Sequence, residues 1–315
     1  MDDFATSADS GDRAAEPQQR GGFRRKLYFL TPWLVLSLSL AITGLAWRSA
    51  NTALEQAEQT QFDFRVREVL ELIEQRMHAY EQTLLGVRGL FGASHRVERE
   101  EFRSFVANLH LTENYPGIQG VGFSLVIPAD ELPAHLRQVR KEGFPGYSVQ
   151  PEGQRDLYTS IVYLEPFSGR NLRAFGYDMY AEPVRRAAME RARDSGDPAM
   201  SGKVRLKQEG GRDEQSGMLM YVPIYRNGAP YATPAERRAA IIGWAYAPFR
   251  MNDLLEGIQG RRASDLDFEI YDGTRKDAAA LMYDSYRDTP AGADLPQGAL
   301  EALNVLTIAG HPWTV

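Results

Sequence analysis

The longest apolar run in the chain lies near its N-terminus and predicts a transmembrane helix. Residues 27–47 carry no charged side chain. At ~1.5 Å per residue, a helix of this length reaches ~30 Å, which matches the hydrocarbon core of a bilayer. A cleaved signal peptide has a shorter apolar core and small residues before its cleavage site, whereas Trp47 ends this run. A buried helix of a soluble domain rarely extends so far without a charge, so we expect a membrane span.

The charges on either side of this run predict its orientation. Arg24, Arg25 and Lys26 precede it, and Arg48 stands alone after it. The positive-inside rule then places residues 1–26 in the cytoplasm and the rest of the chain, beyond the helix, in the periplasm of a cell with an inner membrane. The tail is rich in polar and small residues and has almost no apolar side chains, so we expect it to be disordered.

After the apolar run, hydrophobic positions recur every three or four residues and predict a long stalk helix over residues 48–94. No proline interrupts residues 51–92. The periodic positions are Phe62, Val66, Val69, Ile73, Met77, Tyr80, Leu84, Val87 and Phe91. Their spacing is close to a heptad seam. The stripe has two compatible interpretations: a seam that makes a homodimer and carries a mechanical signal, or a face that packs on its own domain.

Further along the chain, short strand-like runs alternate with helical intervals and predict an α+β fold. We expect helices at 98–111, 130–141, 183–194 and 249–257, and strands at 118–127, 157–164, 218–225, 239–247, 266–271, 280–286, 305–307 and 313–315. Because several strands follow one another directly, antiparallel sheets are favoured over a parallel one.

Composition narrows the classes of function. The net charge of −6 is spread along the chain, and no basic cluster for nucleic acid stands out. The absence of cysteine excludes disulfides, thiolate metal sites and a cysteine nucleophile. The five histidines have no spacing suited to a metal, and phosphate-loop, Rossmann and serine-hydrolase motifs are missing. We therefore predict no catalytic residue, no metal and no cofactor, and we do not expect an enzyme.

Four stretches, in this order and spacing, resemble one family of sensor domains. They are YPGIQGVGFSLVIP at 115–128, a segment at 158–206 that begins YTSIVYLEPFSG, MLMYVPIYRNG at 218–228, and RRAAIIGWAYAPFRMNDLLEGI at 237–258. Together they resemble the CHASE domain, which lies outside the membrane in histidine kinases, diguanylate cyclases, related bacterial receptors and plant cytokinin receptors. The resemblance extends over roughly residues 50–315 and is weaker after residue 260.

The resemblance implies that the stalk is followed by two PAS-like α+β subdomains with antiparallel sheets. We expect a membrane-distal subdomain over residues 95–235, which binds a small molecule in this family, and a membrane-proximal one over residues 236–315. The family's architecture also implies a second membrane helix after Val315 and then an output domain, such as a histidine kinase or a diguanylate cyclase. The chain then corresponds to the sensor part of a longer receptor.

The resemblance also implies which residues contact a ligand. Asp178, in FGYDMY at the end of an expected strand, can accept a hydrogen bond from a ligand N–H, as an Asp does in the cytokinin-binding members. Its alternative role is to cap the turn before Pro183. The other candidates can line an apolar pocket or begin its closing strand: Tyr158, Tyr163, Phe175, Tyr180, Met200 and Ser201. Aromatic residues on strands more often belong to a plain core, and that alternative stays open.

Two functions from different classes follow. The first is a small-molecule sensor region that passes ligand binding through the stalk helix to an output domain outside this chain. The second is a membrane-anchored adaptor that binds another envelope protein and no small molecule. The missing motifs disfavour a third function, an extracytoplasmic hydrolase.

Overall fold

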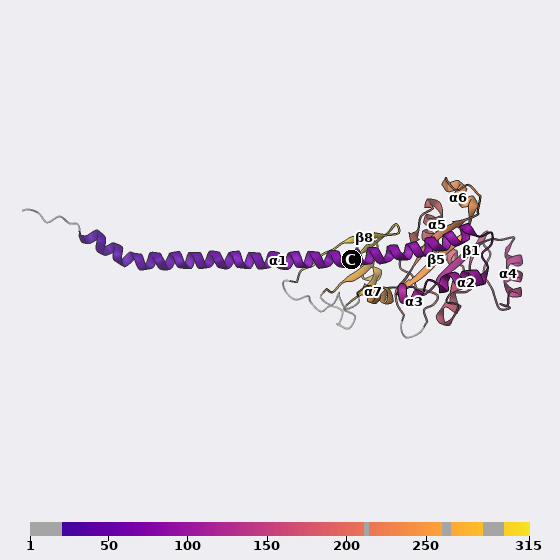
Figure 1. Ribbon diagram of the computed structural model, residues 1–315, viewed down its shortest axis with the longest axis horizontal. Coiled ribbons are helices and arrows are strands. Elements are labelled where there is room, and N and C mark those ends of the chain that lie inside the picture. Colours follow the sequence, from indigo (N-terminus) through magenta and orange to yellow (C-terminus); the bar gives the residue numbers. More distant parts are fainter. Residues whose placement is uncertain (1–20, 211–213, 260–265, 286–298) are drawn as a thin grey trace, which may run out of the picture. The chain divides into compact units, whose positions relative to one another are not determined.

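A computed structural model of the protein describes residues 21–210, 214–259, 266–285 and 299–315 (Figure 1). The chain divides into two compact units, Met1–Gln61 and Phe62–Val315, and each is described by itself. Most of the cytoplasmic tail expected over residues 1–26 lies outside the described residues, as does Tyr286 of the expected strand 280–286.

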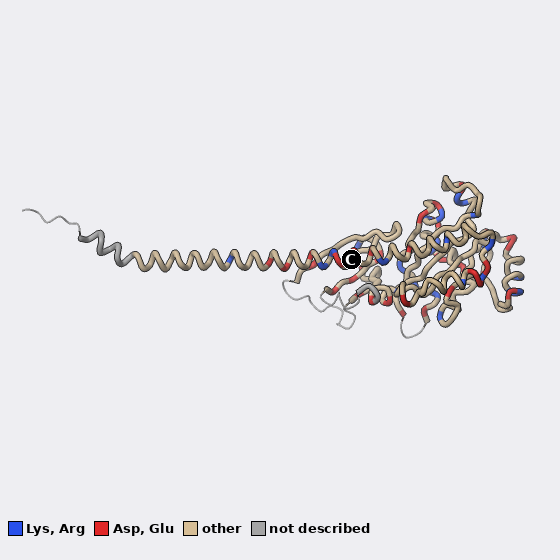
Figure 2. Tube along the Cα trace, viewed as in Figure 1, with Lys and Arg blue, Asp and Glu red and all other residues tan. Residues whose placement is uncertain are grey.

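The described part of the first unit belongs to helix α1, which runs from Gly21 to Ala93. From Thr31 onward this helix is long and apolar enough, by length and composition, to cross a membrane. Figure 2 shows its uncharged stretch in tan. Large apolar side chains there, such as Leu34 and Leu45, are exposed, which is unfavourable in water and favourable in a bilayer. The expected transmembrane and stalk segments therefore form one continuous helix.

In the second unit, five antiparallel strands form a sheet in the order β2-β1-β5-β4-β3. They are β1 Val121–Pro128, β2 Leu157–Glu165, β3 Ala199–Met200, β4 Gly217–Tyr225 and β5 Ile241–Arg250. All but the two-residue β3 coincide with runs rich in β-branched and aromatic side chains, which favour strands. Trp244 lies opposite Ser124, and Tyr246 lies opposite Tyr221, so each pair shares a face of the sheet.

Four shorter antiparallel strands form a second sheet in the order β7-β6-β9-β8. They are β6 Glu269–Asp272, β7 Leu281–Asp284, β8 Val305–Ile308 and β9 His311–Thr314. Helix α7, Met251–Gln259, follows β5 directly and precedes this sheet. The two antiparallel sheets confirm the α+β class. A division at residues 235/236 would separate β5 from β1 and β4, to which it is hydrogen-bonded.

The remaining helices differ from expectation at two places. The expected helix 98–111 ends at Ala107, because His110 takes a left-handed conformation with φ of 50° before a new short helix. The strand expected from Ala239 starts at Ile241, because the capping box of Thr233 and Glu236 begins a helix there. These helices are α2 Arg99–Ala107, α3 Leu111–Asn114, α4 Leu132–Lys141, α5 Pro183–Ser195 and α6 Pro234–Ala240.

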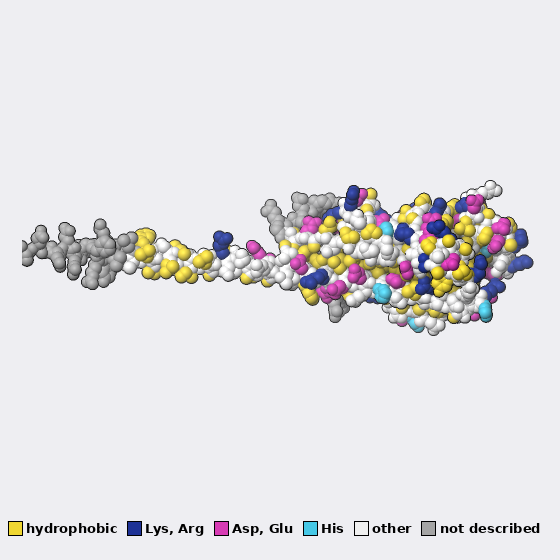
Figure 3. All heavy atoms as spheres, turned by 90° about the horizontal axis from the view of Figure 1, so that it is seen from above, with side chains coloured by type: hydrophobic (Ala, Val, Ile, Leu, Met, Phe, Trp, Pro, Cys, Tyr) yellow, Lys and Arg dark blue, Asp and Glu magenta, His cyan; other side chains and the backbone are white. Residues whose placement is uncertain are grey.

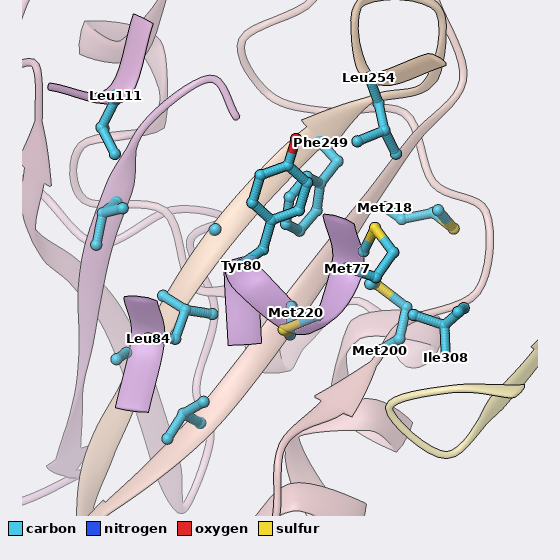
Figure 4. Packing of buried hydrophobic residues seen from close by; sticks show 14 of the residues in the cluster. Met77, Tyr80, Leu84, Leu111, Met200, Met218, Met220, Phe249, Leu254 and Ile308 are labelled. Atoms are coloured by element: carbon cyan, nitrogen blue, oxygen red, sulfur yellow. The ribbon is translucent and has the colours of Figure 1, made fainter. Parts of the chain in front are cut away.

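One face of the five-stranded sheet, here called the α1 face, packs against α1. The buried part of the apolar stripe comprises Ile73, Met77, Tyr80, Leu84 and Val87. Figure 4 shows Met77 and Tyr80 beside residues of the sheet, and the rings of Tyr80 and Phe249 are 5.2 Å apart. The stripe thus packs on its own domain, which confirms one of its two interpretations. Dimerisation through this helix stays a prediction.

The opposite face of the sheet, here called the α5 face, packs against α5 and against a short 3-10 helix, Met179–Ala181. Tyr221, Trp244 and Tyr246 are buried there. The Trp244 indole Nε1 donates a hydrogen bond of 3.0 Å to the backbone oxygen of Met189 in α5. The two faces are formed by alternate side chains of the same strands, as in β5, where Ala245 belongs to the core with α1 and Tyr246 to the core with α5.

Candidate functional site

The carboxylate of Asp178 is fully buried beside β2. Its Oδ1 accepts three hydrogen bonds, from the Thr159 backbone N–H at 3.1 Å, the Thr159 hydroxyl at 2.7 Å and the Tyr180 backbone N–H at 3.1 Å. Its Oδ2 is also buried and has no hydrogen-bond partner among the described residues. Arg155 places its Nε 3.5 Å from Oδ2, an ion pair without a hydrogen bond. One carboxylate oxygen therefore keeps its capacity to accept hydrogen bonds.

The segment that carries Asp178 is attached to β2 by its backbone. The Gly176 N–H donates to the Ile161 oxygen at 3.0 Å, and the Ile161 N–H donates to the Tyr177 oxygen at 3.2 Å. Gly176 has a φ of 84°, and a side chain there would collide with the Ser148 backbone oxygen. The glycine thus allows the chain to turn at this point and to direct Asp178 toward Thr159.

Two further buried polar atoms on the α5 face lack a partner. They are the hydroxyl oxygens of Ser124 in β1 and Tyr246 in β5, neither of which has a hydrogen bond within the described part of the chain. Both side chains are fully buried. Gly122 lies opposite Tyr246, and a Cβ added to Gly122 would lie 2.7 Å from the Tyr246 hydroxyl. The absence of a side chain at Gly122 therefore leaves room for the phenol over β1.

The strand register places these polar groups on the same face as Asp178. Ile161 lies opposite Ser124, and Thr159, two residues earlier in β2, lies opposite Val126. Side chains two residues apart share a face of a strand. Buried polar groups are nearly always hydrogen-bonded, so unused capacity on three side chains of one face favours a site for a polar ligand.

Burial and one arginine set the charge state of the phenols here. Burial raises the pKa of Tyr246 well above its ordinary value, the nearby Tyr221 raises it further, and Arg185 of α5 opposes them. Arg185 is itself buried, and its guanidinium donates to the Tyr177 hydroxyl at 3.1 Å. The Tyr246 hydroxyl, which is neutral at pH 7 even with an ordinary tyrosine pKa, therefore stays neutral at higher pH and can both donate and accept a hydrogen bond.

The aromatic residues around these groups supply an apolar surface. The ring of Tyr180 stacks on Trp244 with centroids 6.1 Å apart. The Tyr221 hydroxyl donates to the sulfur of Met179 at 3.5 Å. A mainly apolar wall with a few oriented polar groups is typical of small-molecule sites.

On the surface in Figure 3, charges of both signs are interspersed over the second unit.

Of the seven candidates from the sequence, the structure brings Asp178 and Tyr180 together on the α5 face. Asp178 also caps the short helix Met179–Ala181, so its ligand and capping interpretations coexist, while Glu182 caps α5. Ser201 holds β3 to β4, because its hydroxyl accepts a hydrogen bond of 2.9 Å from the Leu219 N–H.

The other four candidates lie elsewhere in the domain. Tyr163 and Met200 pack in the core with α1, and the Tyr163 hydroxyl donates to the Val97 backbone oxygen at 2.9 Å. Tyr158 and Phe175 pack in a separate cluster around Tyr147. Tyr158 also contacts Arg155, the ion-pair partner of Asp178. A ligand role for these four residues stays a prediction.

The sequence reasoning missed Thr159, Ser124, Tyr246, Arg185 and Arg155. Ser124 has a sequence signal, because it is the only hydroxyl within the apolar strand VGFSLVI at 121–127. Tyr246 follows Trp244 by two residues, which predicts a shared face. Whether their hydroxyls find a partner depends on segments that are distant in the sequence, so no local sequence pattern predicts it.

The fold and the site together define a class: an α+β domain that follows a helix long and apolar enough to cross a membrane, with buried polar groups on one face of its sheet that lack a partner among the described residues. The sequence model of the CHASE domain matches residues 95–283, more than half of the chain. The chain belongs to the CHASE domain family, and with it to the extracellular sensor regions of signalling receptors.

A curated relative and two solved structures show similarity to this chain. Hybrid signal transduction histidine kinase A of Dictyostelium discoideum is 26% identical over 150 residues, 46% of this chain and 7% of that protein. The ligand-binding domain of the Pseudomonas aeruginosa PAO1 amino acid chemoreceptor PctC, in complex with GABA, has a TM-score of 0.39 at 10% identity, covering 78% of this chain and 91% of that one. The periplasmic sensory domain of the Campylobacter jejuni chemoreceptor Tlp1 has a TM-score of 0.44 at 9% identity, covering 80% and 90%.

Proposed function

We propose that this chain is the small-molecule sensor region of a transmembrane receptor and that its ligand binds on the α5 face of the five-stranded sheet. The observation that carries the proposal is the buried Asp178 carboxylate, whose Oδ1 accepts three hydrogen bonds while Oδ2 accepts none from the described residues. The hydroxyls of Ser124 and Tyr246 on the same face, which have no partner within the described ranges, extend the polar groups available to a ligand.

Signal transfer would use the strands that separate the two faces. In β5, Tyr246 faces α5, whereas Ala245 and Ala247 belong to the core with α1. A ligand that shifts β5 therefore changes the packing of α1, and small shifts of packed helices are a common form of signal.

We further propose that the chain forms a homodimer through α1 and that a kinase or cyclase output domain follows in the whole receptor.

The membrane arrangement is part of the same proposal. The N-terminal tail would be cytoplasmic, the domain periplasmic and the membrane the inner one. The membrane-distal subdomain would include β5 and α7, and the membrane-proximal one would start near residue 266.

Cysteine labelling tests the orientation. Since the chain has no cysteine, Ser10→Cys and Ser104→Cys can be labelled selectively. An impermeant maleimide should label Ser104→Cys on intact spheroplasts and Ser10→Cys only after lysis; the reverse pattern refutes the orientation.

Thermal unfolding of the purified chain against a panel of metabolites tests the function. We expect at least one compound to raise the unfolding temperature, by mass action on the folded state. Asp178→Asn should abolish that rise, while Tyr163→Phe, on the other face, should retain it. If no compound has an effect and pull-downs recover an envelope protein, the adaptor function replaces this proposal.

A further inference from the structure

Arg155 pairs with the buried Asp178 carboxylate and is itself partly exposed to solvent. The Arg155 side chain is 22% exposed, whereas that of Asp178 is 0% exposed. The distance of 3.5 Å between Arg155 Nε and Asp178 Oδ2 leaves Oδ2 without a hydrogen bond among the described residues. Arg155 thus compensates the charge of the carboxylate but does not satisfy its oxygen.

Arg155 is held in place by contacts that do not involve Asp178. Both terminal nitrogens of its guanidinium donate to the Pro151 backbone oxygen, and the guanidinium carbon lies 5.0 Å from the centre of the Tyr158 ring. The Tyr158 hydroxyl accepts from the Arg155 backbone N–H at 3.1 Å and donates to the Gly153 oxygen at 2.8 Å. Tyr158 therefore organises the loop that presents Arg155.

The ion pair between Arg155 and Asp178 is exchangeable because it lacks a hydrogen bond to Oδ2 among the described residues. A buried carboxylate is costly unless a cation compensates it. Because the Arg155 side chain is already partly exposed, its guanidinium reaches water when it moves outward. A charged N–H group of a ligand can then form a hydrogen bond of ~2.7–2.9 Å to Oδ2, which is stronger than a neutral one. A neutral ligand group supplies the hydrogen bond but not the compensating charge.

We propose that Arg155 is an exchangeable counter-ion that the cationic N–H group of a ligand displaces from Asp178. Arg155 thereby selects for ligands with an ammonium, amidinium or guanidinium group. This inference rests on the proposed binding function and specifies the chemical class of its ligand. Arg155 acts as the outer cover of the site, and Tyr158 positions it.

The accessibility of the Asp178 carboxylate can be measured by carbodiimide coupling of glycine ethyl ester to the full chain in detergent. Peptide mass spectrometry then gives the rate at which Asp178 is labelled. Arg155→Gln should speed the labelling of Asp178 by about tenfold, the factor that corresponds to ~1.4 kcal/mol of easier access. Arg186→Gln is the matched control, because Arg186 donates to the Tyr180 backbone oxygen without contacting Asp178. Equal labelling rates in the wild type and Arg155→Gln would refute the cover.

A cation and its neutral isostere test the exchange. Ethylguanidinium should slow Asp178 labelling in Arg155→Gln, whereas ethylurea, of the same shape, should not. Should Arg155→Gln not fold, the wild type decides: ethylguanidinium should raise its unfolding temperature above that in equal ethylurea. Equal effects of the two compounds would overturn the proposal. A panel ligand without a cationic group would also refute it, while the sensor function itself would stand.

Discussion

The Thr159 hydroxyl donates a 2.7 Å hydrogen bond to Asp178 Oδ1 and so joins β2 to the turn that precedes the short helix Met179–Ala181. Both side chains are fully buried. Together with the two backbone N–H donors, this bond satisfies one carboxylate oxygen and fixes the direction of the other. The pair is therefore the structural basis of the candidate site.

Thr159→Val should destabilise the domain by about 1–3 kcal/mol, because it leaves a buried charged acceptor with one hydrogen bond fewer. Thr159→Ser keeps the hydroxyl and should cost only about 0.8 kcal/mol for the lost methyl. Urea unfolding of the two variants measures the difference. Equal losses in both would mean that the hydroxyl does not support Asp178.

Tyr246→Phe should leave the free energy of unfolding unchanged or raise it, because it removes a buried hydroxyl that has no partner in the described residues. Tyr80→Phe is the matched comparison on the α1 face. The Tyr80 hydroxyl donates to the Pro116 backbone oxygen, so its removal should cost about 0.5–1.5 kcal/mol. If Tyr246→Phe is the more destabilising change, the Tyr246 hydroxyl is already paired within the protein and is not reserved for a ligand.

Gly122→Ala should destabilise the domain by about 1–3 kcal/mol through overpacking. The added Cβ would lie 2.5 Å from the nearest ring atom of Tyr246. Gly89→Ala is the control, since nothing lies within 4 Å of a Cβ there. Because Gly89 lies within α1, Gly89→Ala should raise the free energy of unfolding by about 0.5–1 kcal/mol. Thermal unfolding of the two variants measures these changes. A Gly122→Ala variant with unchanged stability would contradict the position of the Tyr246 phenol over β1.

Asp272 should contribute stability that is lost in acid. Burial raises the pKa of Asp272. Hydrogen bonds from His311 at 2.5 Å and from the Lys203 N–H at 2.9 Å lower it, and because these effects together exceed that of burial, the pKa lies below its ordinary 3.8. A carboxyl with a lowered pKa stabilises the fold above its unfolded pKa, and this contribution disappears as pH falls through the folded pKa. Unfolding free energies measured from about pH 2 to 6 should therefore vary less steeply in Asp272→Asn. Parallel curves would contradict this role.

Much of the fold can be predicted from the sequence because its signals are local. The charge-free run and the stripe that includes Met77 and Tyr80 predict α1, and apolar runs predict the longer strands. The break before Leu111 has no local stop signal, since a left-handed His110 is uncommon. Helix α6 does carry a sequence signal, the Thr233–Glu236 capping box, which the apolar run beginning at Ala239 obscures.

The site is less predictable than the fold. Asp178 can be identified by family resemblance, and Tyr180 by proximity to it. Tyr163 appears equally suitable in the sequence, but strand alternation places its ring on the α1 face. Arg155 lies in a polar loop, and its contact with Asp178 spans 23 residues of sequence that only the folded chain brings together.

The most direct test of the central claim is calorimetric titration of the compound that gives the largest thermal shift in the panel. We predict that Asp178→Asn weakens its binding by about tenfold or more and that Tyr163→Phe changes it by less than about twofold. The opposite result, with binding lost in Tyr163→Phe and intact in Asp178→Asn, would place the ligand on the α1 face and contradict the account.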